Sequence, residues 1–255
     1  MPIPERLKPT FASSRPAQTL EARRRLIVAL DVPTAEAAED LVMRLDGACQ
    51  WFKVGLELFT AAGPVVVNTL ASRGYSVFLD LKFHDIPNTV AGAVRSAARM
   101  GVSMMTLHAA GGPAMLAAAR AAVDDLQDPP ELLAVTVLTS MDGAQLQSAG
   151  VERSPAAQVE LLGKMGLQSG IRGFVCSPAE VAALRALTGP AGVLVVPGIR
   201  PAGADAGDQK RLSTPAAALY AGASFLVVGR PITQAPDPAQ AAEAILNEMA
   251  EALTP

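Results

Sequence analysis

The sequence predicts an α/β protein, a single (β/α)8 TIM barrel with an N-terminal extension. Eight short apolar runs alternate with alanine-rich amphipathic stretches, which makes strand–helix units of roughly 30 residues each. The runs are almost continuously hydrophobic, as is typical of parallel strands covered on both faces. An open doubly wound sheet is the alternative, and it is disfavoured because no GxGxxG turn follows the first run.

The expected strands begin after residue 25. Residues 1–25 mix prolines, serines and charges, and we expect them to form a mostly irregular arm in front of a barrel domain over residues 26–255. The strands are expected at Leu26–Val32, Trp51–Leu56, Ser76–Phe83, Met104–Ala109, Leu132–Leu138, Gly173–Ser177, Val193–Ile199 and Phe225–Arg230.

Helix start and stop signals fall between these runs. Thr34 is expected to cap a helix over residues 35–45, and Pro87 to open a helix that ends near Met100. Three further starts have a capping hydroxyl followed by proline at the first helical position, namely Ser154-Pro155, Ser177-Pro178 and Thr214-Pro215. Glycines in helix-ending positions precede three of the strands, namely Gly74, Gly101 and Gly222.

Composition and charge limit the possible partners. Half of the residues are apolar, and 21 basic against 24 acidic residues give a net charge of −3. This balance gives no general attraction to nucleic acid or to anionic lipid. No apolar stretch approaches the roughly 18 residues of a membrane span, and we expect no secretory signal. Two cysteines, Cys49 and Cys176, are too few for a disulfide framework, so a reduced cytoplasmic setting is expected.

Polar residues stand at the carboxyl ends of the expected strands, where barrel active sites lie. Asp80 and Lys82 are two residues apart on the third strand, so regular alternation would put both side chains on one face. Lys53 on the second strand and Asp31 on the first are expected to point the same way. Such a network could aim a proton donor and a negative charge at a substrate. The alternative, ion pairs that stabilise the barrel mouth, is less favoured because buried charges rarely increase stability.

Two later strand ends have the features of a phosphate site. The seventh strand ends in Val196-Pro-Gly-Ile-Arg200 and the eighth in Val228-Gly-Arg230. Glycines that expose backbone N–H groups beside an arginine match the phosphate position of such barrels. The loop over residues 200–213 contains Gln209 and is a candidate lid over a bound anion, with an ordinary surface loop as the alternative.

Metal binding is not expected. The two histidines, His84 and His108, are separated in the sequence and make a weak zinc site, and His108 could line the site or be a structural histidine. Carboxylates that could in principle hold magnesium belong to Asp31, Asp80 and Asp85. The neighbouring lysines would compete for the same carboxylates.

The segment Asp80-Leu-Lys-Phe-His-Asp-Ile-Pro-Asn-Thr89 resembles the signature of the bacterial orotidine 5′-phosphate decarboxylases. The resemblance extends across nearly the whole domain, in order, through Ala29-Leu-Asp-Val-Pro33, Lys53-Val-Gly-Leu-Glu-Leu-Phe59, Thr106-Leu-His-Ala109, Val135-Thr-Val-Leu-Thr-Ser140, Val196-Pro-Gly-Ile-Arg-Pro201, Gly207-Asp-Gln-Lys-Arg211 and Val228-Gly-Arg-Pro-Ile232. Some of these segments are common to phosphate-binding barrels. Together they are specific to this family.

The resemblance implies that the protein removes CO₂ from orotidine 5′-monophosphate to give uridine 5′-monophosphate, the last step of de novo pyrimidine synthesis. It implies that Lys82 protonates C6, that Asp80 lies beside the substrate carboxylate, and that Asp85 helps to fix Lys82. It also implies that Asp31 and Lys53 bind the ribose hydroxyls. Further substrate contacts are implied for Ile86, Thr89, Thr139, Ser140, Pro197, Arg200, Gln209, Gly229 and Arg230. No cofactor is implied.

The family also implies a homodimer in which Asp85 and Thr89 reach into the partner's site. One rival is a magnesium-dependent relative, such as a sugar-phosphate decarboxylase or hexulose-phosphate synthase, but the continuation His84-Asp-Ile-Pro-Asn-Thr89 favours the orotidine enzyme. The other rival is a catalytically silent nucleotide-phosphate-binding protein, which the intact charged residues argue against. The length of the arm and Arg172, where the family often has an acidic residue, are departures from the family pattern.

Overall fold

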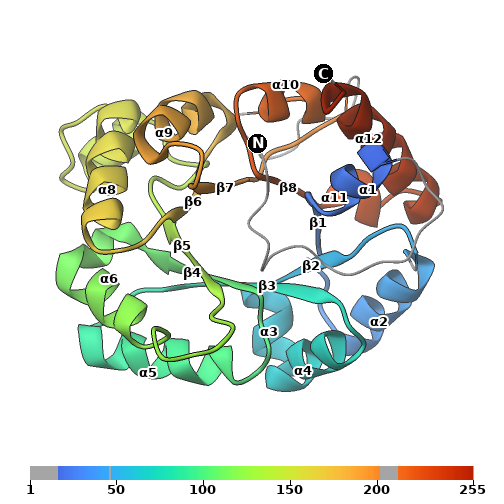
Figure 1. Ribbon diagram of the computed structural model, residues 1–255, viewed down its shortest axis with the longest axis horizontal. Helices are drawn as coiled ribbons and strands as arrows, with labels where there is room; N and C mark the ends of the chain where they lie inside the picture. The colour runs from blue at the N-terminus through green and yellow to red at the C-terminus, as the bar shows by residue number, and fades with distance from the viewer. Residues whose placement is uncertain (1–16, 46, 202–211, 255) are drawn as a thin grey trace.

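Eight parallel strands close into a barrel in this computed structural model, which describes residues 17–45, 47–201 and 212–254. The strands pair in chain order, and β8 pairs back with β1. Figure 1 views the ring of strands end-on, with helices around it. The prediction of a single (β/α)8 barrel is confirmed, and the open doubly wound sheet is excluded.

Each strand lies at its predicted run. The strands are β1 (Leu26–Ala29), β2 (Trp51–Gly55), β3 (Ser76–Phe83), β4 (Met104–His108), β5 (Glu131–Val135), β6 (Gly173–Val175), β7 (Val193–Val196) and β8 (Phe225–Val228). Most of them end before the predicted run does, because the chain leaves the ladder there and forms the loops of the barrel mouth.

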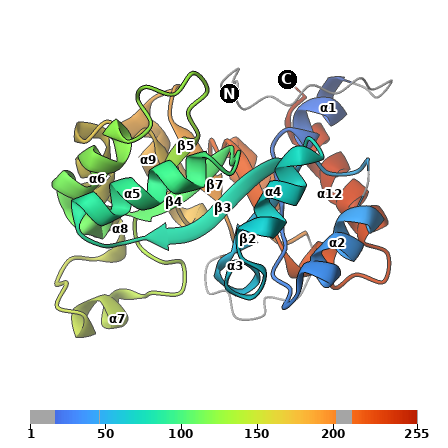
Figure 2. The ribbon, with the colours of Figure 1, turned by 90° about the horizontal axis from the view of Figure 1, so that it is seen from below.

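The helices cover the outside of the barrel. They are α2 (Ala35–Arg44), α3 (Leu56–Ala62), α4 (Pro64–Ser72), α5 (Pro87–Ala98), α6 (Gly112–Ala121), α7 (Gly143–Ser148), α8 (Pro155–Gln168), α9 (Val181–Thr188), α10 (Pro215–Tyr220), α11 (Arg230–Thr233) and α12 (Pro238–Ala252), with two 3-10 turns at Ala109–Gly111 and Pro178–Glu180. Figure 2 shows α7 projecting away from the other helices. The predicted caps are present: Thr34, Ser154 and Thr214 each accept a hydrogen bond from a backbone N–H three residues later.

Part of the N-terminal arm is helical. Helix α1 covers Ala17–Arg23, and residues 1–16 lie outside the described part of the chain, so the expectation of a mostly irregular arm stays a prediction. The helix packs against α12, and Ala22 is fully buried there. Because α12 comes from the other end of the chain, this contact has no signature in the local sequence.

The core has two layers. The larger layer lies between strands and helices and includes Leu79, which alternates outward from the site residues of β3. The smaller layer fills the barrel interior with Ile27, Ala29, Trp51, Phe78, Met104, Leu133, Val193, Val195, Phe225 and Val227. The rings of Trp51 and Phe225 meet edge to face, with centroids 5.1 Å apart. This apolar plug closes the interior and leaves the carboxyl-end mouth for polar groups.

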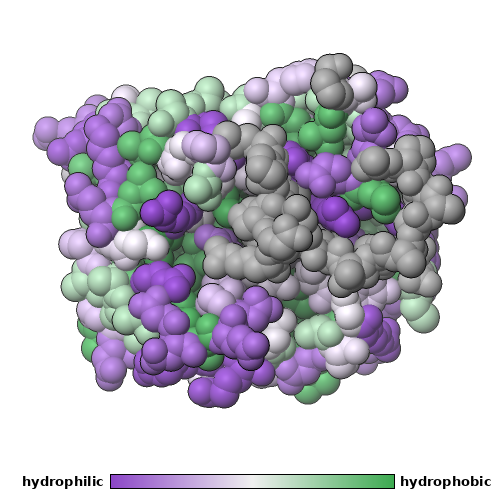
Figure 3. Space-filling model, viewed as in Figure 1, coloured by the Kyte–Doolittle hydropathy of each residue, from purple (hydrophilic) through white to green (hydrophobic). Residues whose placement is uncertain are grey.

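The face in Figure 3 carries hydrophilic side chains over much of its rim, with apolar areas between them. None of the helices within the described ranges is long and apolar enough to cross a membrane.

Candidate active site

A cavity of about 490 Å³ lies over the apolar plug at the carboxyl ends of the strands. Ala29, Phe78 and Val227 belong to both the plug and the cavity wall, so they form its floor. The predicted site residues that line the cavity are Asp31, Lys53, Asp80, Lys82, Thr139, Pro197, Arg200, Gly229 and Arg230. Residues from the first, second, third, fifth, seventh and eighth βα units therefore meet at one site, as a closed barrel requires.

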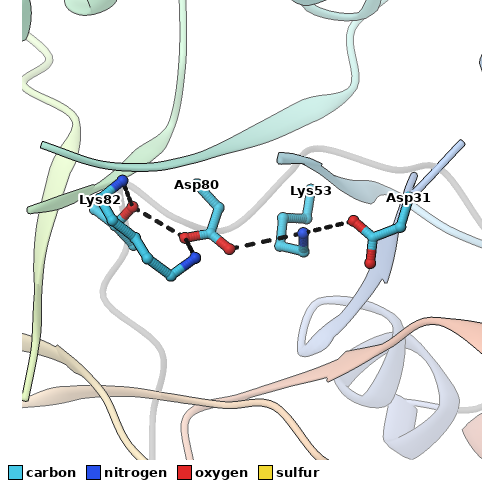
Figure 4. A network of polar contacts seen from close by, with 5 residues as sticks. Asp31, Lys53, Asp80 and Lys82 are labelled. Carbon is cyan, nitrogen blue, oxygen red and sulfur yellow. Dashed lines mark hydrogen bonds and ion pairs between the residues drawn. The ribbon is translucent and has the colours of Figure 1, made fainter. Parts of the chain in front are cut away.

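Four charged side chains form a continuous row of alternating sign (Figure 4). The Lys53 ammonium lies 2.9 Å from Asp31 Oδ1 and 3.6 Å from Asp80 Oδ2. The Lys82 ammonium lies 2.9 Å from Asp80 Oδ1. Lys53 and Asp80, in the middle of the row, are nearly buried, whereas the side chains at its two ends are more exposed, 58% for Asp31 and 29% for Lys82.

A strand bulge, and not simple alternation, brings Asp80 and Lys82 together. β3 pairs with β4 at Leu79–Met105 and next at Phe83–Leu107, so Asp80, Leu81 and Lys82 stand opposite Thr106 alone. Lys82 has a φ of 52°, and among the described residues it is the one non-glycine in the left-handed region. The strand predicted over Ser76–Phe83 is confirmed, but the regular alternation expected between Asp80 and Lys82 is interrupted by this register shift against β4.

The carboxyl group of Asp80 is held in its ionised form. Burial by itself would raise its pKa, but attraction to Lys53 and Lys82 and hydrogen bonds from Lys82 and Thr106 outweigh burial and lower the pKa. Asp80 therefore carries a negative charge next to the cavity at neutral pH. Since both of its oxygens face cations, it also fixes where the Lys82 ammonium lies.

A second group of polar residues lies at the ends of β7 and β8. Gly198 and Gly229 bring backbone to the cavity, with Arg200 and Arg230 beside them. Backbone hydrogen bonds join the two ends of the loop that is predicted as a lid. Arg200 N donates to Ser213 O, and Ser213 N donates to Gly198 O. Gln209 falls outside the described residues. The two arginines and the glycine backbone in the cavity wall make this end of the cavity suited to an anion.

Four predicted site residues do not line the cavity of this chain. Asp85, Ile86, Thr89 and Ser140 are all exposed, and the side chain of Ile86 is 67% exposed. Asp85 Oδ1 accepts a hydrogen bond from the Ile86 backbone N–H, and Thr89 lies in the first turn of α5. Asp85, Ile86 and Thr89 form a surface at the start of α5, outside the cavity, whereas Ser140 lies in the loop between β5 and α7.

His108 ends β4, and its ring centroid lies 5.4 Å from that of His84. Burial lowers the pKa of His108, and repulsion from His84 and Lys82 lowers it further. Within the described ranges no cluster of three or more His, Cys, Asp or Glu side chains could hold a metal ion.

Sequence reasoning missed several residues of the site. Thr106 is fully buried and hydrogen bonds to both Asp80 and the Lys82 backbone. The sequence feature that could have identified Thr106 as a site residue is its place as a polar residue inside an apolar strand run, two residues before His108. Thr233 and Gln234 line the cavity beyond Arg230, and the apolar wall includes Val135, Val137 and Val175. No sequence pattern distinguishes these valines from ordinary core residues.

Comparison with known proteins agrees with this geometry. Residues 24–245 match the family model described as Orotidine 5'-phosphate decarboxylase / HUMPS family. The chain is 52% identical over 247 residues to an orotidine 5'-phosphate decarboxylase of Moorella thermoacetica, covering 94% of this chain and 98% of the relative. It is 54% identical over 228 residues to one of Halorhodospira halophila, covering 89% of this chain and 97% of that protein.

Solved structures agree as well. The crystal structure of orotidine 5'-phosphate decarboxylase from Lactobacillus acidophilus superposes with a TM-score of 0.78 at 41% identity, covering 88% of this chain and 98% of that one. An uncharacterized conserved protein from Geobacillus kaustophilus gives the same TM-score, 0.78, at 34% identity, covering 88% of this chain and 99% of that one. With its closed barrel, its row of alternating charges and these matches, the chain belongs to the orotidine 5'-phosphate decarboxylase / HUMPS family.

Proposed function

We propose that this protein is a carboxy-lyase that converts orotidine 5′-monophosphate to uridine 5′-monophosphate and CO₂, the last step of de novo UMP synthesis. One observation carries the proposal: a lysine ammonium, Lys82 Nζ, sits 2.9 Å from the Asp80 carboxylate in a cavity that has arginines at its other end. A charged proton donor at one end of the cavity and an anion-binding group at the other match a substrate with a carboxylate at one end and a phosphate at the other.

Lys82 is the proton donor of the proposed reaction. The bond between C6 and the carboxylate breaks, its electron pair stays on C6, and a proton from Lys82 Nζ forms the new C6–H bond. Lys82 then regains its proton from solvent. Because Asp80 holds the ammonium in place, the positive charge is already positioned when negative charge develops on C6.

Asp80 has a second role, next to the substrate carboxylate. Two like charges about 4 Å apart repel by roughly 4 kcal/mol at an effective dielectric near 20. This repulsion disappears as CO₂ leaves, so it lowers the barrier relative to the bound substrate. The lowered pKa of Asp80 supports this role, because the group stays ionised beside another anion.

The remaining contacts hold the substrate by its unreactive parts. Asp31 and Lys53 bind the ribose hydroxyls, and Thr139 and Ser140 contact the pyrimidine edge. Pro197, Arg200, Gln209, Gly229 and Arg230 surround the phosphate, with Gln209 bridging base and phosphate. Binding energy gained at the phosphate is then available at the reacting carbon. The enzyme should therefore act on orotidine 5′-monophosphate and lose its activity when the substrate is orotidine, which lacks the phosphate.

The active form is a homodimer in which Asp85, Ile86 and Thr89 contact the substrate in the partner's site. The exposure of all three residues outside this chain's own cavity supports the arrangement. The protein acts in the cytoplasm and uses no metal ion or organic cofactor, since Lys82 and Asp80 supply the acid and the fixed charge.

The direct test is an assay with purified protein and no added cofactor. The absorbance of orotidine 5′-monophosphate should fall as CO₂ is released, and the rate should be unchanged by EDTA. Activity lost on EDTA treatment and restored by magnesium would instead favour a metal-dependent member of the family. Tight nucleotide binding without turnover would identify a silent binding protein.

A further inference from the structure

Thr106 lies at the centre of the bulge that distinguishes β3 from a regular strand. Three residues of β3, Asp80, Leu81 and Lys82, face this single residue of β4. Thr106 is fully buried. Met104 and His108, two residues before and after it on β4, share its face, which is the inner face of the barrel. It therefore occupies the point at which the regular β3–β4 ladder is interrupted.

The Thr106 hydroxyl uses both of its hydrogen-bonding functions on the two proposed catalytic residues. Its oxygen accepts a hydrogen bond from the Lys82 backbone N–H at 2.8 Å. The same hydroxyl donates its hydrogen to Asp80 Oδ1 at 3.0 Å. A hydroxyl has one proton to donate, so accepting from Lys82 leaves that proton directed at Asp80.

The contact with Lys82 replaces a missing ladder bond. The register shift leaves the backbone of Lys82 outside the regular pairing, at a φ of 52° in the left-handed region, where a residue with a side chain is strained. A partly buried backbone N–H that has lost its ladder partner needs another acceptor. The Thr106 oxygen supplies it, and so keeps Lys82 in the conformation that turns its side chain toward Asp80.

We propose that Thr106 is a positioning residue for decarboxylation, which fixes the Lys82 backbone and the Asp80 carboxylate in one relative geometry. The inference rests on the proposed function, since it assigns Thr106 a role through the two groups that carry the chemistry. Asp80 Oδ1 accepts hydrogen bonds from both Lys82 Nζ and Thr106 Oγ1. Loss of the Thr106 hydroxyl therefore frees the Asp80 carboxylate to rotate, and the Lys82 ammonium is no longer held in place.

The test uses three variants at this position. Thr106→Val keeps the shape and removes the hydroxyl, Thr106→Ala removes it without the risk of overpacking, and Thr106→Ser keeps it. Valine and alanine should lower kcat on the order of 10- to 100-fold, as expected when reacting groups are displaced by an ångström or less. KM should stay within about threefold, because the ribose and phosphate contacts are untouched. Serine should restore kcat to near the parent value.

Thr136→Val on β5 is the matched control. Thr136 is also buried, its hydroxyl lies 3.5 Å from Val175 O, and it does not line the cavity, so the same chemical change there should leave kcat unchanged. A folded Thr106→Val or Thr106→Ala enzyme with parental kcat would overturn the proposal. So would a Thr106→Ser enzyme as impaired as the alanine variant.

A crystal structure of the Thr106→Ala variant tests the inference without reference to activity. The Lys82 backbone should leave the left-handed region, or the distance between Lys82 Nζ and Asp80 Oδ1 should exceed hydrogen-bonding range. An unchanged geometry of both residues would refute the positioning role. Absence of turnover by the parent enzyme would refute the proposed function alone, and the structural result would still decide the role of Thr106.

Discussion

The ammonium of Lys82 and the carboxylate of Asp80 lie 2.9 Å apart across a bulge in β3. Lys82 reaches Asp80 from a left-handed backbone conformation, with φ at 52°. Asp80 in turn faces Lys53 at 3.6 Å, so its charge is shared between two cations. The relationship couples the proposed proton donor, the fixed negative charge of Asp80 and the proposed ribose-binding residues, and each part of it can be tested separately.

Replacing Lys82 by alanine removes the proposed acid. General acid catalysis contributes typically 10²- to 10⁴-fold, so kcat should fall by at least about 100-fold in a direct absorbance assay. Lys164→Ala is the control, because this exposed lysine on α8 pairs with Glu160, does not line the cavity and should not affect the rate. A Lys82→Ala enzyme as fast as the parent would refute the assigned role.

Replacing Asp80 by asparagine should reduce stability in a pH-dependent way. The folded-state pKa of Asp80 is below 3.8, so its ionisation stabilises the fold above pH 3.8, and this contribution is lost as pH falls through the lower, folded-state pKa. The difference in unfolding free energy between parent and Asp80→Asn should therefore be largest near neutrality and shrink below pH 3.8. Urea unfolding at a series of pH values measures it, and a difference independent of pH would contradict the assignment.

Adding a methyl group at Gly55 should disturb the site without unfolding the barrel. A Cβ there would lie 2.9 Å from Lys53 Nζ and 3.3 Å from Asp31 Oδ1, whereas the backbone of Gly55, with φ at −95°, accepts any residue. Gly55→Ala should lower kcat/KM by about tenfold through displacement of Lys53, with little change in Tm. Gly143→Ala, whose Cβ meets only Pro155 Cδ at 3.9 Å, serves as control. Equal kcat/KM for both variants would argue against the effect.

His108 should make the fold sensitive to mild acid. Its pKa in the folded protein is below 6.5, so the unfolded chain takes up its proton first as pH falls, and stability decreases from pH 6.5 downward through the folded-state pKa. His108→Gln should be less sensitive to acidification over that interval. Thermal unfolding of both proteins between about pH 5 and pH 8 measures the difference. Parallel pH curves would contradict it.

Shared active sites predict complementation between two inactive variants. A hybrid of Lys82→Ala and Asp85→Ala subunits has one site with both substitutions and one site with neither, provided Asp85 acts in the partner's site. Unfolding and refolding the two variants together should restore part of the parental activity, which neither variant shows alone. Without restoration, although hybrids form, Asp85 would act within its own subunit.

Local patterns are sufficient for the framework of this protein. Continuous apolar runs identify parallel strands, and the hydroxyl–proline pairs before α8 and α10 identify helix starts, because an apolar run and a helix cap each consist of residues close together in the sequence. Helix α1 is the exception, since it is stabilised by α12 from the far end of the chain.

By itself, the sequence determined a barrel of eight strands with Asp31, Lys53, Asp80 and Lys82 at its mouth. The tertiary structure alone decided how these groups meet. The register between β3 and β4 sets the bulge, places Thr106 against it, and turns Lys82 toward Asp80. Register depends on the packing of strands distant in the sequence, and no local pattern of residues encodes it.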